Sequence, residues 1–350
     1  MDTPDERAAA ALGAAAYGYF AGGAGDEITL RDNADAWSRY ALRPRVLVDV
    51  SNRDPGTTLL GVGRPHPIIL APMAYQRHAH PDGEGAMARA AAVTDTTMIL
   101  SSQTTTSPAD VAAAAPDGNR WFQLYVFKDR QVSFDLVAAA RDSGYEALVL
   151  TVDFPVAGWR ERDKKSGFQV EHPIALNLSG GPIKTEDIFA MHDASLTWDD
   201  ITEFAELSGM PLLLKGILRP DDAELAVGAG AAGVIVSNHG GRQLDTSLSG
   251  ADALGPIVEA IGGRIDVLVD GGIRRGWDVA KAMALGADAV LVGRQVLWGL
   301  VNDGQAGAEA VLRQLLDEFD NTLALTGCPK AADLDRSFVQ VAPWGVPPNR

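Results

Sequence analysis

The sequence predicts a (β/α)8 TIM barrel, formed by a single domain that spans residues 1–350. Three observations lead to this prediction. Short apolar runs recur along the chain, each hydrophobic almost throughout, as parallel strands covered on both faces are. Patterns typical of helices of about a dozen residues separate most of these runs. Polar and charged residues gather directly after the runs, where the strands of such a barrel carry its chemistry.

The predicted strands and helices alternate between residues 67 and 292. The eight strands are Pro67–Ala71, Met98–Ser101, Trp121–Val126, Ala147–Asp153, Pro211–Lys215, Gly233–Asn238, Asp266–Asp270 and Ala289–Val292. The helices include Pro108–Ala115, Gln131–Ser143, Pro220–Gly228 and Trp277–Leu285, with Ser107 as a suitable cap and Gly286 as a suitable stop. Eight βα units favour a closed barrel over a doubly wound sheet, and no G-x-G-x-x-G motif follows the first strand.

Two segments stand outside this alternation. Residues 1–66 are expected to form a helical cover at the start of the domain. Residues 158–196 are too long for an ordinary connection and contain Gly180-Gly181-Pro182, so we expect a mobile lid over one mouth of the barrel. Neither segment indicates a second domain.

Composition excludes several classes of partner. A net charge of -16 and a pI near 4.7 argue against binding to nucleic acid or to an anionic membrane. Cys328 is the one cysteine, which excludes an internal disulfide and suits a reducing cytosol. The apolar stretch Ala8–Ala16 is short and lacks a basic leader, and no run reaches the roughly 18 apolar residues of a membrane span. We therefore expect a cytoplasmic protein.

Side chains capable of chemistry end or follow nearly every predicted strand. They are Ser101, Gln123, Tyr125, Thr151, Asp153, Lys215, His239, Arg242, Asp270 and Arg294. Lys215 ends an apolar strand and is costly to bury unless an anion meets it, although it could also reach solvent. Recurrence at so many strand ends favours a binding site there.

The seventh and eighth strands end in motifs that suit a phosphate. Residues 270–272 read D-G-G and residues 293–294 read G-R, and barrels commonly bind phosphate at these loops. Glycines let backbone N–H groups approach an oxyanion, and Arg274 and Arg294 can add charge-assisted bonds.

The stretch S-N-H-G-G-R-Q-L-D, residues 237–245, combines a base with a cation. His239 stands three residues before Arg242, and the two glycines between them clear space for a negatively charged substrate. A base beside an anion-binding arginine suits proton abstraction next to a carboxylate. Asp245 is expected to be structural, holding Arg242.

Other kinds of site find little support. His78-x-His80 suits a polar loop at least as well as a metal site, and H-E-x-x-H is absent. The chain also lacks the G-x-S-x-G elbow of serine hydrolases. A flavin or phosphate cofactor remains, and no metal is expected.

The order and spacing of the motifs resemble the FMN-dependent 2-hydroxy acid oxidases and dehydrogenases, the family of glycolate oxidase, lactate oxidase and mandelate dehydrogenase. The resemblance extends from Tyr17 to Cys328 and implies FMN as the cofactor. The strongest matches are S-N-H-G-G-R-Q-L-D (237–245), D-G-G-I-R-R-G-x-D-V-x-K-A-x-A-L-G-A (270–287), F-Q-L-Y (122–125), T-V-D-x-P (151–155) and L-K-G (214–216).

The resemblance implies catalytic roles for several residues. His239 would remove the proton from the substrate's α-carbon, or from its hydroxyl if a hydride is transferred, and Asp153 would stabilise the imidazolium. Tyr125 would hydrogen-bond the substrate oxygen that becomes a carbonyl. Lys215 would lie at the flavin N1 edge, where reduction builds negative charge.

Substrate and cofactor contacts follow from the same resemblance. Arg242 and Arg160 would clamp the substrate carboxylate, since a guanidinium fork matches that group, and Tyr19 would add a hydroxyl. The remaining flavin contacts would come from Ala74, Ser101, Gln123, Thr151, Ser237, Asp270, Gly272, Arg274, Gly293 and Arg294. Of these, Asp270 would bind the ribityl chain, and Arg274 and Arg294 the phosphate.

Departures from the family bear on the substrate. Gln103 stands where plant glycolate oxidases carry tryptophan, and Ala157 where they carry leucine. Both changes remove bulk and predict a substrate larger than glycolate. A-P-M-A-Y-Q-R (71–77) is closer to the hydroxymandelate-oxidising members, which favours an aryl substrate. Trp159 replaces the first of two adjacent arginines and leaves Arg160 in register.

The sequence is therefore interpreted as a flavoenzyme that oxidises an L-2-hydroxy acid, such as (4-hydroxy)mandelate, with dioxygen as acceptor and H2O2 as product. A dehydrogenase that uses a quinone or carrier, a decarboxylating monooxygenase, an isomerase without a redox cofactor and a non-catalytic flavin-binding protein are the alternatives. Membrane-bound relatives carry an apolar anchor in the lid, whereas residues 168–198 here include several charges. The family also implies a homo-oligomer, often a tetramer.

Overall fold

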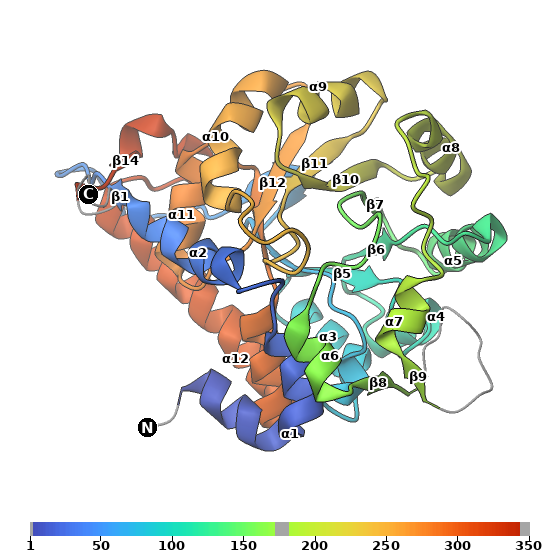
Figure 1. Cartoon of the computed structure of the whole chain (residues 1–350). Coiled ribbons are helices and arrows are strands. Elements are labelled where there is room, and N and C mark those ends of the chain that lie inside the picture. The colour runs from blue at the N-terminus through green and yellow to red at the C-terminus, as the bar shows by residue number, and fades with distance from the viewer. Residues whose placement is uncertain (1–2, 172–181, 344–350) are drawn as a thin grey trace.

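The computed structural model describes residues 3–171 and 182–343, and a closed barrel of parallel strands lies at its centre (Figure 1). The barrel strands are β4 (Ile68–Leu70), β5 (Thr97–Ser101), β6 (Arg120–Leu124), β7 (Leu148–Thr151), β10 (Leu212–Ile217), β11 (Gly233–Val236), β12 (Asp266–Asp270) and β13 (Ala289–Val292). β13 pairs with β4 in the register Val290 to Ile68, which closes the ring. The prediction of a (β/α)8 barrel is confirmed, and the doubly wound sheet is wrong.

A helix follows each barrel strand and covers its outer face. These helices are α3 (Gly83–Ala92), α4 (Pro108–Ala114), α5 (Arg130–Asp142), α8 (Asp199–Ser208), α9 (Pro220–Gly228), α10 (Gly250–Ile261), α11 (Gly276–Ala284) and α12 (Arg294–Thr326). The Ser107 hydroxyl accepts from the N–H of Asp110 and caps α4, as predicted. Strands read as continuous apolar runs because one face points to these helices and the other to the barrel interior.

The barrel interior is a packed core, and a hairpin packs against it at the end where the strands begin. Ile69, Trp121 and Leu213 are among the interior side chains, all at most 1% exposed. The hairpin consists of β2 (Thr57–Leu59) and β3 (Val62–Arg64), and Leu59 joins the interior cluster. The segment 1–66 thus contributes strands as well as the helices that we expected.

The rest of that segment lies against the barrel's outer helices and its carboxyl-end mouth. α1 (Pro4–Ala21) packs along α12, the blue helix beside the long red one in Figure 1. α2 (Ile28–Ala36) begins where the Asp245 carboxylate accepts from the N–H groups of Ile28 (3.3 Å) and Thr29 (2.8 Å). Asp245 therefore caps α2, and the expectation that it holds Arg242 is wrong. β1 (Tyr40–Leu42) pairs with β14 (Val339–Val341).

The long connection after β7 contains short elements on either side of residues 172–181. They are α6 (Glu161–Ser166), β8 (Gln169–Val170), β9 (Ile183–Lys184) and α7 (Thr185–Phe189), and β8 pairs antiparallel with β9. Gly180 and Gly181, on which we based a mobile lid, lie outside the described residues. Across residues 3–171 and 182–343, the helices are too short or too polar to cross a membrane.

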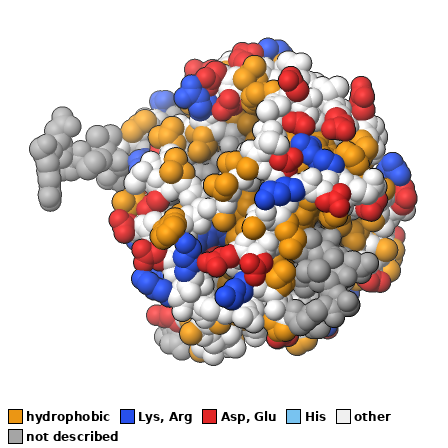
Figure 2. Space-filling model, turned by 45° about the vertical axis from the view of Figure 1, so that its right-hand side comes forward, with side chains coloured by type: hydrophobic (Ala, Val, Ile, Leu, Met, Phe, Trp, Pro, Cys, Tyr) orange, Lys and Arg blue, Asp and Glu red, His pale blue; other side chains and the backbone are white. Residues whose placement is uncertain are grey.

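Charged side chains of both signs are interspersed on the face drawn in Figure 2. Figure 2 shows Lys and Arg side chains scattered among Asp and Glu on one face, instead of gathered into one positive patch. This distribution accompanies the net charge of -16.

Glu84 links two loops at the carboxyl end of the barrel. Its side chain is fully buried in α3, and its oxygens accept from the N–H groups of Gln76 (3.1 Å) and Thr105 (2.8 Å). The hydroxyls of Thr105 and Thr106 donate to it as well, at 2.8 Å each. The loops after β4 and β5 are thereby fixed relative to each other.

We expect Glu84→Gln to lower the free energy of unfolding by about 1–3 kcal/mol, because the new amide N–H2 would face buried donors and cannot accept from them. Urea unfolding of the protein measures the change. Glu309→Gln is the matched control, since Glu309 pairs with the half-exposed Arg313 on α12 and contributes about 0.5 kcal/mol or less. Equal losses in the two variants would contradict the role of Glu84.

Candidate active site

A left-handed turn after β11 presents His239 at the carboxyl end of the barrel. His239 has φ 59° and Gly241 has φ 74°, and a non-glycine residue adopts such values only with support. Support comes from the Ser237 hydroxyl, which accepts from the His239 N–H at 3.0 Å. A Cβ on Gly241 would lie 2.6 Å from the backbone nitrogen of Leu30, so a glycine is required there.

His239 is held between a carboxylate and a phenol. Its Nδ1 lies 2.9 Å from Oδ1 of Asp153, and its Nε2 lies 3.1 Å from the hydroxyl of Tyr125. An ionised carboxylate only accepts, so Nδ1 carries the ring proton and Nε2 is the basic nitrogen. Gly216 makes this contact possible, since a Cβ there would lie 2.5 Å from Cβ of Asp153.

Burial and charge set the protonation states of this group. Burial lowers the pKa of His239 and outweighs the attraction of Asp153. Burial alone would raise the pKa of Asp153, but His239 and Lys215 outweigh it, and the pKa is lowered. Burial raises the pKa of Tyr125 above its ordinary value. At neutral pH the site therefore holds a neutral imidazole, a carboxylate and a phenol, which is a set able to accept a proton.

Arg160 and Arg242 lie together beside this group. The Arg160 side chain is 4% exposed, and its Nε donates to the carbonyl oxygen of Arg242 at 2.8 Å. Arg242 Nη1 donates to the carbonyl oxygens of Tyr19 (2.8 Å) and Gly22 (2.7 Å). Burial and the neighbouring Arg242 lower the pKa of Arg160 to about 10. An anion bound between the two guanidinium groups would relieve this repulsion.

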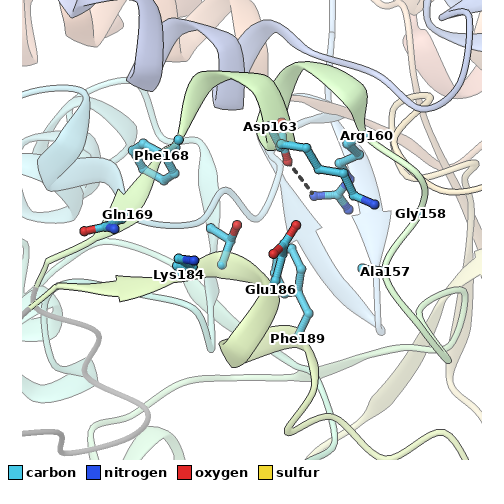
Figure 3. A pocket seen from close by; sticks show the side chains of 12 residues that line it. Ala157, Gly158, Arg160, Asp163, Phe168, Gln169, Lys184, Glu186 and Phe189 are labelled. Carbon is cyan, nitrogen blue, oxygen red and sulfur yellow. Dashed lines mark ion pairs between the residues drawn. The ribbon is translucent and has the colours of Figure 1, made fainter.

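Asp163 faces both arginines at a distance. Its Oδ2 lies 3.7 Å from Nη1 of Arg160, the pair joined by the dashed line in Figure 3. The same oxygen lies 4.0 Å from Nη2 of Arg242. Within the described residues, both of its buried carboxylate oxygens have no hydrogen-bond partner. Burial raises the pKa of Asp163 against the pull of Arg242 and Arg160. Both distances are too long for hydrogen bonds. An anion that approached the two guanidinium groups more closely than Asp163 does would therefore bind them more strongly.

A cavity of about 190 Å³ opens next to Arg160. Ala157, Asp163 and Phe189 line it together with Lys184, so it lies between the two ends of the long connection (Figure 3). The structure thus places Ala157 on a cavity wall beside Arg160. Its contact with substrate stays a prediction.

Tyr19 is buried against an aromatic ring and a cation. Its ring stacks on Phe168 with 4.5 Å between centroids and 18° between planes. The Arg242 guanidinium lies 5.1 Å from the same ring, a cation–π contact. Tyr19 therefore supports Arg242 through its ring and through its carbonyl oxygen.

Gln243 connects the loops that carry the site, a role that the sequence did not reveal. Its Oε1 accepts from the Gly158 N–H (2.9 Å) and from Nη2 of Arg160 (3.2 Å). Its Nε2 donates to the carbonyl oxygens of Asp153 (2.7 Å) and Val156 (2.9 Å). Trp159, which stands in the place of the first of two adjacent arginines of the family and directly precedes Arg160, is 66% exposed.

Aromatic rings surround the base on the side of the long connection. The ring of Phe154 lies 5.7 Å from His239, 5.3 Å from Phe189 and 5.2 Å from His192. His192 also bonds Gln103, which is 2% exposed. The smaller Gln103 was expected to favour a substrate larger than glycolate, and this stays a prediction; in the structure its amide contacts the His192 ring.

Lys215, in β10, supplies a buried cation at the carboxyl end of the barrel. Its Nζ lies 3.1 Å from Oδ2 of Asp270 and donates to the Ser237 hydroxyl at 2.9 Å. Burial opposes its charge, but Asp270 and Asp153 outweigh burial and raise the pKa of Lys215. Over the described chain, Oδ1 of Asp270 is buried without a partner. An approaching hydroxyl would satisfy that oxygen.

Amide and hydroxyl groups line the ends of three neighbouring strands. The Ser101 hydroxyl donates to Oε1 of Gln123 (2.9 Å), whose Nε2 donates to the Thr151 hydroxyl (2.9 Å). Ala74 lies in the loop after β4 and is half-buried. These groups form a polar edge across β5, β6 and β7, suited to a heterocycle with alternating donors and acceptors.

The ends of β12 and β13 present glycines and arginines. Gly271 and Gly272 have φ 95° and 77°, and Gly293 precedes the first turn of α12, whose N–H groups can bind an anion. Burial and the neighbouring Arg242 and Arg274 lower the pKa of Arg294 to about 9. Arg274 is exposed, so its guanidinium can bind an anionic group of a ligand.

These groups fit FMN. The unpartnered Asp270 oxygen suits a ribityl hydroxyl, and the crowded cations at the start of α12 suit a phosphate. Lys215 would offer positive charge to a bound isoalloxazine, which carries negative charge when reduced. The polar edge of Ser101, Gln123 and Thr151 suits the pyrimidine ring. The residue assignments stay predictions.

Comparison with known proteins agrees with this donor set. The family model described as FMN-dependent dehydrogenase matches residues 8–341. The chain is 46% identical over 342 residues to glycolate oxidase 3 of Arabidopsis thaliana, covering 95% of this chain and 92% of that protein. It is 46% identical over 341 residues to L-lactate oxidase of Nostoc sp., covering 93% of each.

Solved structures give the same result. The chain resembles a mandelate oxidase solved with (S)-4-hydroxymandelic acid, with a TM-score of 0.90 and 39% identity over 97% of this chain and 98% of that one. An active chimera of (S)-mandelate dehydrogenase gives a TM-score of 0.89 and 37% identity, again with 97% and 98% covered. The chain therefore belongs to the FMN-dependent dehydrogenase family, and it is an FMN-dependent oxidoreductase that acts on 2-hydroxy acids.

Proposed function

We propose that this enzyme oxidises an aryl (S)-2-hydroxy acid of the mandelate type to the 2-oxo acid, with dioxygen as electron acceptor and hydrogen peroxide as product. The observation that carries the proposal is the basic Nε2 of His239 near the buried guanidinium of Arg160, the partly buried guanidinium of Arg242 and a group of aromatic rings. A carboxylate, a proton to be removed and an aryl group would each meet a matching partner.

In this reaction the substrate loses two electrons and two protons, and dioxygen finally takes up both electrons and both protons as hydrogen peroxide. Arg160 and Arg242 bind its carboxylate and orient the α-carbon toward His239, whose Nε2 accepts one proton. Asp153 accepts the Nδ1 hydrogen bond and stabilises the imidazolium that results. Tyr125 donates to the substrate oxygen as it becomes a carbonyl. FMN, when bound, supplies the two-electron acceptor, and Lys215 stabilises negative charge at its edge.

An aryl side chain is supported by Phe154, whose ring lies 5.7 Å from His239, and by Phe189 and His192, whose rings pack against Phe154. Aromatic walls favour an aromatic ligand because rings pack edge to face and in offset stacks. The similar mandelate oxidase was solved with (S)-mandelic acid and with (S)-4-hydroxymandelic acid.

Dioxygen as acceptor is supported by the names of similar proteins, which include glycolate oxidases and a lactate oxidase. The similar mandelate dehydrogenase favours a second candidate, transfer of the electrons to a quinone or carrier. Oxygen consumption and peroxide formation, measured beside reduction of an artificial dye, distinguish the two. Slow oxygen use with rapid dye reduction would reject the oxidase.

Anaerobic mixing with a panel of 2-hydroxy acids tests the substrate. We expect (S)-mandelate and its ring-substituted analogues to bleach the flavin absorbance faster than glycolate or lactate. A preference for glycolate would overturn the aryl proposal. Formation of the decarboxylated acid, in place of the 2-oxo acid, would identify a monooxygenase.

The pH dependence of this reduction follows from His239. Because the base must be unprotonated and its pKa is lowered, we expect the second-order rate constant to be level at neutral pH and to fall as pH drops through that lowered pKa. Asp153 opposes the lowering, so Asp153→Asn should move the acid limb to still lower pH and reduce the plateau rate. Stopped-flow absorbance measures both. A rate that rises toward acid pH would contradict the assignment of the base.

A further inference from the structure

Asp163, in α6, carries a buried carboxyl group that makes no hydrogen bond. Its side chain is 7% exposed, and within the described residues neither of its carboxylate oxygens has a hydrogen-bond partner. Ionised groups in a protein interior are normally both paired and hydrogen-bonded, because burying a charge without such partners is costly. The position of Asp163 therefore calls for an explanation beyond packing.

Neutral oxygen atoms orient the two guanidinium groups that Asp163 faces. Arg160 donates from Nε to the carbonyl oxygen of Arg242 (2.8 Å) and from Nη2 to Oε1 of Gln243 (3.2 Å). Arg242 donates from Nη1 to the carbonyl oxygen of Gly22 (2.7 Å). None of these three hydrogen bonds involves Asp163, so both arginine side chains would keep their orientation without its charge.

Asp163 faces the guanidinium nitrogens that those three hydrogen bonds do not use. Its Oδ2 lies 3.7 Å from Nη1 of Arg160, along the dashed line in Figure 3, and 4.0 Å from Nη2 of Arg242. At these distances the carboxylate acts on the two arginines through its charge and not through hydrogen bonds. Asp163 therefore reduces the positive charge of the pair and leaves both nitrogens able to donate to a ligand.

A third guanidinium group, that of Arg294, also acts on Asp163. Burial raises the pKa of Asp163, and Arg242, Arg160 and Arg294 oppose the rise. Three cations thus surround one acid at the mouth of the barrel. A substrate carboxylate that arrives between Arg160 and Arg242 is attracted by the guanidinium groups and repelled by the like charge of Asp163. The second effect sets a limit on how tightly the carboxylate binds.

We propose that Asp163 is a positioning residue that acts through Arg160 and Arg242, its negative charge competing with the substrate carboxylate for the two guanidinium groups. The inference rests on the proposed function, in which this pair binds the substrate carboxylate, and deepens it. The 2-oxo acid product carries the same carboxylate, so Asp163 weakens the binding of product as well. Weaker binding of the product speeds its release.

Binding of two unreactive analogues tests the proposal. Phenylacetate and phenylacetamide have similar size and lack the hydroxyl that is oxidised, and only the first is charged. By calorimetry on the FMN-loaded enzyme, we expect Asp163→Asn to bind phenylacetate about tenfold tighter than the native enzyme does, because the repelling charge is gone. The affinity for phenylacetamide should not change. A damaged site would bind both compounds more weakly, so damage cannot produce a gain that is specific to the anion.

Two further variants complete the design. Asp163→Glu keeps the charge on a side chain longer by one methylene, which brings it closer to the guanidinium groups. It should weaken phenylacetate binding severalfold and leave phenylacetamide binding unchanged, and it keeps the test decisive if Asp163→Asn does not fold. Glu161→Gln is the matched control, since it removes one negative charge from the exposed side of α6, where Glu161 pairs with Lys165, and should change neither affinity.

Three results would overturn the proposal. The first is binding of phenylacetate to Asp163→Asn that is no tighter than binding to the native enzyme. The second is an equal gain for phenylacetate and phenylacetamide in that variant, and the third is tighter binding of phenylacetate to Asp163→Glu.

The outcomes separate this inference from the function on which it rests. If (S)-mandelate bleaches the flavin while Asp163→Asn gains no affinity for phenylacetate, the aryl function stands and only the role of Asp163 is rejected. If glycolate bleaches the flavin and (S)-mandelate does not, the aryl function fails. Acetate and acetamide then replace the two phenyl compounds, and the same gain in Asp163→Asn, specific to the anion, decides the role of Asp163.

Discussion

Flavin reduction by the best substrate is expected to slow by about 10²–10⁴-fold in His239→Ala, the contribution typical of a positioned general base. Nε2 of His239 is the basic nitrogen of the site, and Asp153 fixes its orientation at 2.9 Å. Without the imidazole, solvent must take the proton. Anaerobic stopped-flow absorbance measures the rate directly, before any acceptor reacts.

Two controls separate loss of the base from damage to the site. The visible spectrum of the variant reports whether FMN is still bound. Added imidazole can enter the space left by the side chain and should restore part of the rate, which it would not do for a misfolded protein. An unchanged rate in His239→Ala would remove His239 from the mechanism.

The second large effect is expected for Arg242→Met. Truncating one member of a buried ionic contact costs about 2–5 kcal/mol, so kcat/KM for (S)-mandelate should fall by roughly 30- to 5,000-fold. The reason is that Arg160 alone would then hold the substrate carboxylate. Steady-state kinetics under fixed oxygen measure the loss.

Arg242 also supports the backbone of Tyr19 and Gly22, so its structural role needs its own control. The methyl ester of (S)-mandelate has no carboxylate charge, and its turnover should change much less than that of the acid. Arg313→Met, on the exposed side of α12, serves as the matched variant and should leave both unaffected. Equal losses for acid and ester would show that Arg242 acts only through packing.

The barrel could be predicted from sequence because each of its strands is buried on both faces and therefore reads as an apolar run. The strand-end residues could be placed for the same reason, since parallel strands deliver their carboxyl ends to one mouth. His239, Asp153 and Lys215 came together in this way from three different strands.

The contacts between loops could not be predicted. Asp245 was expected near Arg242, three residues away, but it caps α2, more than 200 residues distant in the chain. Likewise, no pattern in the chain indicated that His192, 89 residues away in sequence, would bond the Gln103 amide. Such pairings depend on how independent loops fold over the mouth, and no local pattern in the chain encodes them.

The seam between β13 and β4 has a consequence for biosynthesis. Val292 of β13 pairs with Leu70 of β4. One edge of β4 therefore has no neighbouring strand until β13 has been translated and has left the ribosome. During that interval the nascent chain carries an open sheet with exposed backbone groups, a form prone to misassociation. Ring formation thus waits for the last strand, and slow, chaperone-sensitive maturation is the expected result.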